Sequence, residues 1–223
     1  MRWFLLLPFF LLWNTNITAQ TKEALRDSLA EASKALSLNP YSEDLRLRKA
    51  AWNMLLEQWE YAQGEYNYIL KDNPKCIPAL YYRAYSNEKL GRLSFAKNDY
   101  TQLLQIVPNH FEGLLGLSLL CQKEKHYTEA YDNINQLVSQ YPDSAIAYAA
   151  RAGIEMERQY YELAEYDYSE AIKRDGNNID YLLNRVNARL LLRKKKEAKE
   201  DLDRLTKLGV PRANLKHLYK KCK

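Results

Sequence analysis

The three histidines, His110, His126 and His217, carry the side chains with the broadest catalytic chemistry near neutral pH. Imidazole acts as a general base, a proton shuttle or a metal ligand when suitable partners stand at the required spacing. His110 lies in the turn-like segment VPNHF, His126 lies in KEKHY, and His217 lies in a basic terminal stretch. None of them belongs to an HExxH zinc motif, a zinc-ligand pair or a serine-nucleophile elbow. The pattern therefore predicts surface histidines without catalytic or metal-binding roles.

The cysteines Cys76, Cys121 and Cys222 are odd in number and widely spaced, so they do not indicate a disulfide framework. None has a neighbouring cysteine or histidine at metal-ligand spacing. Cys121 ends the apolar run GLLGLSLLC, which is typical of a small core residue.

Acidic residues occur in close pairs, Glu43 with Asp44 and Glu155 with Glu157, and paired carboxylates are one arrangement used for acid–base catalysis. We place these pairs at helix starts or on polar helix faces, where water and the helix dipole favour negative charge. Seven glycines in the whole chain leave little room for a phosphate-binding loop. The sequence therefore predicts a protein that is not an enzyme and that needs no cofactor and no metal.

Prolines recur at a fixed interval, which indicates an internal repeat. Successive members of one series are 34 residues apart, and a glycine takes the next place: Pro40, Pro74, Pro108, Pro142 and Gly176. Proline and glycine interrupt helices, so their fixed interval marks the ends of helical repeats. Starting each repeat three residues later gives repeats 1 to 5, which are 43–76, 77–110, 111–144, 145–178 and 179–212.

Small residues fall into register within these repeats. The twentieth position is alanine throughout: Ala62, Ala96, Ala130, Ala164 and Ala198. The eighth position is small in four repeats and valine in the fifth: Ala50, Ala84, Ser118, Ala152 and Val186. Small residues at two fixed places let two helices approach closely. Each repeat therefore predicts two antiparallel helices of about 13 residues joined by a short turn, which in repeat 2 contains Gly91.

This pattern resembles the tetratricopeptide repeat family over about 170 residues. The resemblance implies an all-α fold, a right-handed α-solenoid of about five 34-residue helix–turn–helix repeats. Residues 20–42 then form an N-terminal capping helix from a partial repeat. Residues 213–223 form a C-terminal capping helix with a basic tail. Repeat 5 departs from the pattern, because Val210 stands where proline is expected and Pro211 follows it.

Charges at positions 7 and 23 of the repeats predict a clip between the two helices of each hairpin. Four repeats carry a basic residue at position 7 and an acidic one at position 23: Lys49 and Glu65, Arg83 and Asp99, Arg151 and Asp167, Arg185 and Asp201. Repeat 3 has Leu117 and Asn133 instead, so it lacks both charges. We expect each pair to contribute about 0–1 kcal/mol where it is exposed.

The resemblance implies that positions 2, 5, 6, 9, 12 and 13 of the first helices face an inner, concave surface, which is where such repeats usually bind partners. Relatives that grip a C-terminal carboxylate use a lysine at position 5 and an asparagine at position 9, and this clamp is absent here. Aromatic, aliphatic and amide residues at positions 5, 6 and 9 form the predicted partner-binding site: Tyr81, Tyr82, Tyr85, Leu115, Leu119, Asn184 and Asn187.

Such a lining suits an apolar or aromatic segment of a protein or peptide, since tyrosine buries much area and keeps a polar tip. The alternative is that the tyrosines pack against neighbouring first helices, the helix of residues 21–38 or a second copy of the chain. The sequence leaves this alternative open.

Residues 1–19 have the layout of a signal peptide, with Arg2, an apolar run from Trp3 to Trp13 and a small residue, Ala19, before the expected cleavage. Eleven apolar residues are too few to span a bilayer, which takes about 20. We therefore expect an exported protein, periplasmic or secreted, with no membrane segment in its mature chain.

The carboxyl-terminal residues 191–223 carry twelve lysines and arginines against four acidic residues. A solvated terminal cap explains this excess, and a docking site for an acidic partner or an anionic surface is the other interpretation. Aromatic residues do not interleave the lysine run 194–196, so nucleic-acid binding is not expected.

The leading hypothesis is a non-catalytic, exported scaffold that binds a protein or peptide on the concave face of its repeats. Two other classes remain. One is a structural subunit of a cell-envelope assembly with its groove permanently filled, and the other is an accessory chain of an enzyme complex.

Overall fold

The computed structural model describes residues 22–222, and every regular element in that range is an α-helix. In chain order the helices are α1 (Lys22–Leu38), α2 (Glu43–Leu55), α3 (Trp59–Asp72), α4 (Ile77–Lys89), α5 (Leu93–Ile106), α6 (Phe111–Lys123), α7 (Tyr127–Gln140), α8 (Ala145–Glu157), α9 (Tyr161–Arg174), α10 (Ile179–Leu191), α11 (Lys195–Lys207) and α12 (Arg212–Lys221). The prediction of an all-α helical repeat is confirmed.

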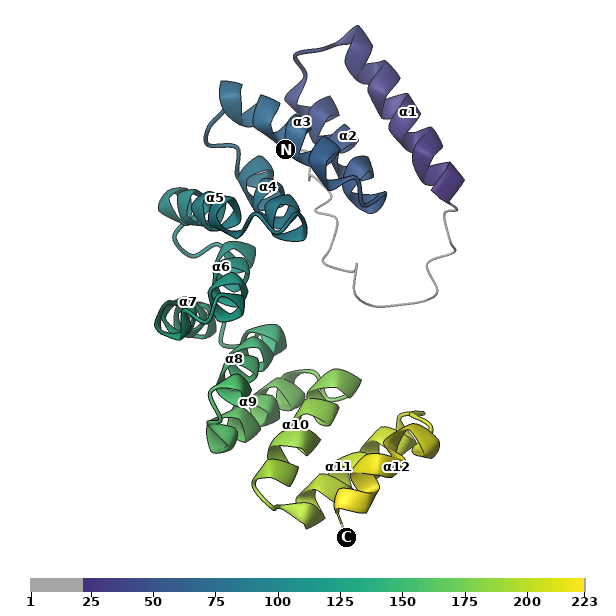
Figure 1. The fold of residues 1–223 in the computed structure, drawn as a ribbon, viewed down its shortest axis with the longest axis vertical. Coiled ribbons are helices and arrows are strands. Elements are labelled where there is room, and N and C mark those ends of the chain that lie inside the picture. Colours follow the sequence, from purple (N-terminus) through teal and green to yellow (C-terminus); the bar gives the residue numbers. More distant parts are fainter. Residues whose placement is uncertain (1–21, 223) are drawn as a thin grey trace. The chain divides into compact units, whose positions relative to one another are not determined.

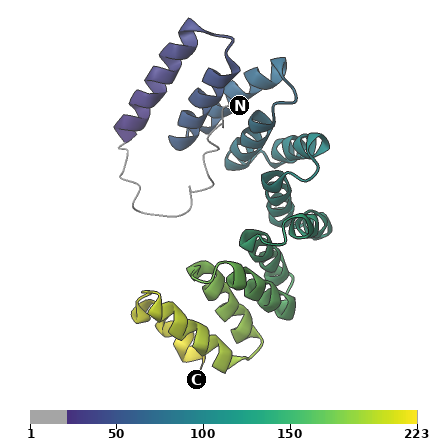
Figure 2. The ribbon, with the colours of Figure 1, turned by 180° about the vertical axis from the view of Figure 1, so that it is seen from behind.

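The chain divides into two compact units, residues 1–90 and 91–223, called the N-terminal and C-terminal units below. Described helices α1–α4 belong to the first and α5–α12 to the second. Within each unit, helices that follow one another in the sequence pack side by side (Figures 1 and 2). The division falls in the turn of repeat 2, so the pairing of α4 with α5 stays a prediction, as do the repeat boundaries themselves.

The turns inside the repeats share one backbone conformation. The fifteenth residue of every repeat has a positive φ between 59° and 71°: Glu57, Gly91, Lys125, Gln159 and Arg193. Gly91 fits this left-handed conformation as the sequence predicts, because it has no Cβ to clash with the backbone. The other four residues adopt it at an energetic cost of about 1–2 kcal/mol each. Packing of the flanking helices therefore determines the turn, and glycine is not required for it.

The small positions are where the helices meet. The alanines at position 20 and the residues at position 8 are all 0% exposed. In repeat 3 the hydroxyl of Ser118, at position 8, donates a 2.9 Å hydrogen bond to the carbonyl of Ala130, at position 20. The hydroxyl is therefore satisfied inside the hairpin, and the close approach predicted from the sequence is confirmed for this repeat.

Two glycines within first helices differ in the space around them, which gives the first prediction. A Cβ added at Gly116 of α6 would lie 2.6 Å from Cζ of Tyr100, a side chain that is only 1% exposed. Gly116→Ala should therefore lower the free energy of unfolding by about 1–3 kcal/mol through overpacking. Urea unfolding followed by circular dichroism measures this change.

Gly153 of α8 is the matched control, because nothing lies within 4 Å of its added Cβ. Gly153→Ala should raise the free energy of unfolding by about 0.5–1 kcal/mol, since alanine reduces the conformational freedom of the unfolded chain. Equal effects of the two substitutions would contradict the packing of Gly116 against Tyr100.

The predicted clip forms in three repeats, with N–O distances of 2.6, 2.6 and 2.7 Å: Lys49–Glu65, Arg151–Asp167 and Arg185–Asp201. Both arginines bind their aspartates through two nitrogens. Bidentate pairs of this kind are stronger than single contacts. Arg83 and Asp99 belong to different units, so their clip stays a prediction.

The same arginines also reach back to the preceding repeat, which the sequence did not predict. Arg151 donates to Asn135 Oδ1 at 3.1 Å, and Arg185 donates to Ser169 Oγ at 3.0 Å. Each acceptor stands 16 residues earlier, at position 25 of the repeat before. One guanidinium therefore ties together three helices in the C-terminal unit.

The predicted signal peptide, residues 1–19, lies outside the described residues. Among residues 22–222, no helix has the length and apolar character needed to cross a membrane.

Candidate partner-binding surface

The tyrosines of α4 are half-buried, and all three take part in ring contacts. The ring of Tyr82 stacks on Tyr66 of α3, with centroids 6.1 Å apart and planes 20° apart. Tyr81 meets Tyr82 edge-on at 5.0 Å. Tyr66 is 1% exposed, and burial raises the pKa of its hydroxyl far above the usual value. Tyr82 therefore covers part of the α3–α4 contact and presents only its remaining surface to a partner.

Tyr85 belongs to a separate aromatic cluster one turn further along α4. Its ring meets Trp59 of α3 edge-on, with centroids 5.9 Å apart. The ammonium of Lys89 lies 5.0 Å from the Tyr85 ring centroid and 6.0 Å from that of Trp59. All three side chains retain exposed surface. Two aromatic rings in contact, with a cation beside them, form a surface that suits an apolar or aromatic side chain with a nearby carboxylate.

The predicted site residues of the C-terminal unit separate into buried and exposed ones. Leu115 is 5% exposed and belongs to the core, which leaves it little surface for a partner. Leu119, on the same helix, is 42% exposed. Asn184 and Asn187 of α10 are also exposed, with their amides available for hydrogen bonds to a peptide backbone.

Two further exposed apolar side chains lie at positions 2 and 13, which the resemblance places on the inner face. Ile146 of α8 is 43% exposed and Leu191 of α10 is 53% exposed. Their positions were among those expected to face inward, but the site prediction drew only on positions 5, 6 and 9. Positions 2, 9 and 13 are seven and four residues apart, so they fall on one face of a helix. Ile146, Leu119 and Leu191 therefore give successive first helices an apolar contribution to this face.

No protein-family model matches the sequence, and no curated protein matches it. Solved structures do match. A tetratricopeptide repeat protein from Parabacteroides merdae superimposes with a TM-score of 0.74 at 23% identity, covering 91% of this chain and 80% of that one. PilW, described as a type IV pilus biogenesis factor, gives a TM-score of 0.74 at 19% identity, covering 82% of this chain and 85% of its own. YrrB, described as having an unusual peptide-binding site, gives 0.61 at 15% identity, covering 80% and 92%.

The chain has the tetratricopeptide-repeat fold. The resemblance drawn from the sequence is thereby confirmed at the level of the fold. Identities of 15–23% in these superpositions leave the function to be argued from the residues of this chain.

Within this tetratricopeptide-repeat chain, Glu155 corrects one expectation from the sequence. It is 4% exposed and lies inside the C-terminal unit, whereas the sequence placed it on a polar helix face. Burial, and then the nearby charge of Asp167, raise the pKa of Glu155 to about 8. Its Oε2 atom has no hydrogen-bond partner among the described residues. Glu155 is therefore a buried acid that holds its proton near neutral pH.

Glu155 occupies position 11, and in repeats 2 and 5 the residue at this position contacts position 21 of the repeat before it. In the N-terminal unit this contact joins two amides, with Gln63 Nε2 donating to Asn87 Oδ1 at 2.6 Å. Further along, Arg189 Nε donates to Glu165 Oε1 at 2.9 Å. Polar side chains at positions 21 and 11 therefore join repeats 1 and 2 through two amides and repeats 4 and 5 through an ion pair.

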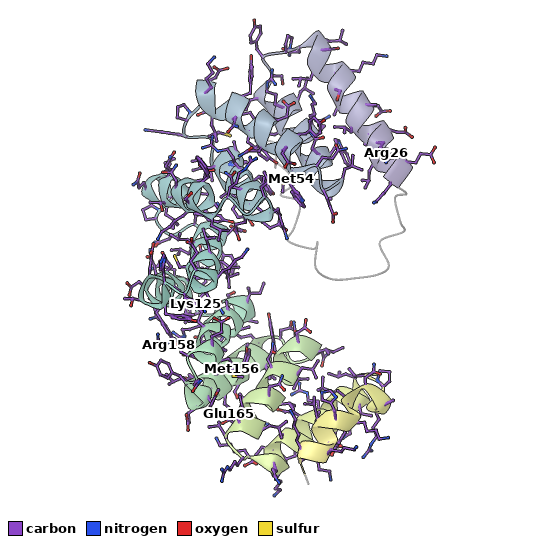
Figure 3. All side chains as sticks on the ribbon, in the orientation of Figure 1. Arg26, Met54, Lys125, Met156, Arg158 and Glu165 are labelled. Carbon is purple, nitrogen blue, oxygen red and sulfur yellow. The ribbon has the colours of Figure 1, made fainter. Side chains whose placement is uncertain are left out.

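Tyr131 is the position-21 residue opposite Glu155. Its buried hydroxyl also lacks a hydrogen-bond partner among the described residues. Burial, and then the charge of Glu155, raise the pKa of Tyr131 to about 12. Nearby, the Arg158 guanidinium lies 4.9 Å from the Tyr127 ring centroid, beside the turn that holds Lys125 (Figure 3). The joint between repeats 3 and 4 therefore combines a buried acid and phenol with an exposed cation–π contact.

One of the three histidines caps a helix and the other two are exposed. His110 caps α6, its Nδ1 accepting a 3.2 Å hydrogen bond from the amide of Gly113. His126 and His217 are exposed. Among residues 22–222 no group of three or more histidine, cysteine, aspartate or glutamate side chains is placed to hold a metal ion.

The thiols of two cysteines are buried. Cys121 is 0% exposed, which confirms it as a core residue, and Cys76 is 5% exposed. Burial raises the pKa of Cys76 to about 11 and that of Cys121 to about 12. Both thiols are therefore protonated at neutral pH, the form with little nucleophilic reactivity.

Proposed function

We propose that this protein is a scaffold that binds an apolar or aromatic segment of another protein on the face formed by its first helices. The observation that carries the proposal is the exposure of Leu119, Ile146 and Leu191 at positions on one helical face of the C-terminal unit. Side chains of this size are exposed at a free-energy cost of about 25 cal/mol per Å² of apolar surface, which a partner would recover.

The surrounding residues support the same interpretation. Asn184 and Asn187 supply exposed amides beside the apolar side chains of α10, as a bound peptide backbone requires. In the N-terminal unit, Tyr85 with Trp59 and Lys89 offers a second, separate contact surface. The proposed function is binding.

A capture experiment with matched leucine variants tests the proposal. The protein is isolated from its host with bound proteins, which mass spectrometry identifies. Leu119→Arg combined with Leu191→Arg should abolish capture, because the charges cannot be buried against an apolar segment. Leu163→Arg is the control, since Leu163 is 54% exposed but lies on the second helix α9. Equal capture by both variants would reject the first-helix face.

We also propose that binding takes place outside the cytoplasm, on the strength of the leader-like residues 1–19. The same isolated protein provides the check, because amino-terminal sequencing should begin at Gln20. A mature chain that still begins at Met1 would contradict export by this route.

A further inference from the structure

The last described helix, α12, continues the register of the repeats. The hydroxyl of Tyr219 donates a 2.8 Å hydrogen bond to Asp203 Oδ1, 16 residues earlier. Arg151 and Arg185 reach their acceptors in the preceding repeat over the same interval. α12 therefore occupies the place of a first helix, and residue 213 corresponds to position 1 of a repeat.

The face of a first helix that carries positions 4 and 8 is called the seam face below. On α12 this face differs from that of the other first helices. Position 8 is small and 0% exposed in repeats 1 to 4 and is a buried valine in repeat 5. In repeat 3 it contacts the second helix of its own hairpin, through the hydrogen bond from Ser118 to Ala130. In α12 position 8 is Lys220 and position 4 is Lys216, and both are exposed. Arg212 continues the row one turn earlier. The three cations stand about 6 Å apart along the helix.

The row borders a shallow hollow of about 360 Å³ lined by Arg212, Ala213, Lys216 and Tyr219. The Arg212 guanidinium lies 4.6 Å from the centroid of the Tyr219 ring, which holds its charge at the edge of the hollow. The carboxylate of Asp203 already accepts the Tyr219 hydrogen bond. α12 itself contains four lysines and arginines and no acidic residue.

We propose that the seam face of α12, defined by Arg212, Lys216 and Lys220, binds an acidic helical segment of a partner protein. The face stands where a second helix would pack in a repeat, so its geometry suits a helix. Lys220 stands where other repeats have a small residue or a valine, and Lys216 stands where three of them have a leucine. Lysines at these places disfavour an apolar helix and select carboxylates spaced one turn apart. This surface is separate from the first-helix face of the proposed function.

A labelled synthetic peptide tests the assignment. The probe is a fluorescein-labelled 15-residue helical peptide with glutamate at every fourth position, and the matched peptide carries glutamine there. We expect anisotropy titrations to show the glutamate peptide binding at least about tenfold more tightly than the glutamine peptide. Binding should weaken as salt rises, because the charges are exposed.

Two triple variants that remove the same amount of charge distinguish binding at this face from general attraction to basic side chains. Arg212→Gln with Lys216→Gln and Lys220→Gln should weaken glutamate-peptide binding by about tenfold or more. The control variant replaces three lysines that are exposed elsewhere in the C-terminal unit with glutamine: Lys123, Lys125 and Lys173. It should bind the glutamate peptide as tightly as wild type does. Circular dichroism and thermal unfolding of both triple variants should match wild type. Lys216→Glu alone provides a second test of binding that alters only one exposed side chain.

Equal binding by the two triple variants, or equal binding of the glutamate and glutamine peptides, would overturn the proposal. So would binding of wild type to vesicles of anionic phospholipid without binding of the peptide, since that result would assign the face to a membrane surface. Neither outcome depends on Leu119 or Leu191, so the two proposals fail independently.

Discussion

Arg151→Met should lower the free energy of unfolding by about 3 kcal/mol at pH 7. Arg151 binds both carboxylate oxygens of Asp167, at 2.6 and 2.9 Å, and the Asp167 side chain is 2% exposed. Glu155 lies beside the same aspartate. Removing the guanidinium would leave a buried carboxylate without its counterion, which is the costly half of breaking a buried ion pair. Urea unfolding at constant ionic strength measures the loss.

An exposed arginine of the same fold is the control. Arg48 pairs with Asp44 at 3.5 Å, and its side chain is 61% exposed. Arg48→Met should change the free energy of unfolding by about 0–1 kcal/mol. Adding Asp167→Asn to Arg151→Met should restore part of the loss, because it removes the unpaired charge. A loss for Arg151→Met no larger than for Arg48→Met would contradict a buried ion pair.

The second large effect is a dependence of stability on pH that Glu155 produces. Its pKa is about 8 in the folded protein and about 4.3 in an unfolded chain, so the folded state binds the proton more tightly. The contribution of the Glu155 proton to the free energy of unfolding is complete below pH about 4.3 and is lost as pH rises through about 8. Glu155→Gln removes this titration, so its stability relative to wild type should rise by about 2 kcal/mol or more between pH 5 and pH 8.5.

The groups around Glu155 define what the measurement reports. Arg151 on its own helix, Asp167 and Tyr168 on α9 and Tyr131 on α7 all interact with it electrostatically. The difference in the free energy of unfolding between a variant and wild type is taken at each pH. This difference cancels the contribution of groups that titrate elsewhere in the chain. Glu157→Gln is the control, because Glu157 is an exposed carboxylate two residues away. If both variants differ from wild type by a pH-independent amount, Glu155 is not protonated in the folded state.

The sequence predicted what the repeat imposes on every copy. Alanine at position 20 and opposite charges at positions 7 and 23 recur in most repeats, and these regularities identified the helix pairs and the clips at Arg151 and Arg185. They could be seen because the same physical contact leaves the same residue type at the same interval.

What the sequence did not predict depends on neighbours that vary between repeats. Leu115 and Leu119 both occupy positions expected on the inner face, yet one is buried and the other is exposed. Exposure at these places depends on side-chain volumes in adjacent helices, which periodicity does not encode. Glu155 was misplaced for a related reason, because position 11 carries a different residue in every repeat but the first two and shows no pattern by itself.

The polar contacts between positions 21 and 11 make the order of the repeats matter. An amide pair joins Gln63 to Asn87, whereas an ion pair joins Glu165 to Arg189. A second copy of repeat 4 placed after the first would set Glu165 against a new Glu155, bringing two carboxyl groups together in a buried joint. Repeats of equal length are therefore not freely interchangeable here, because Glu165 of repeat 4 is matched to Arg189 of repeat 5 and not to another glutamate.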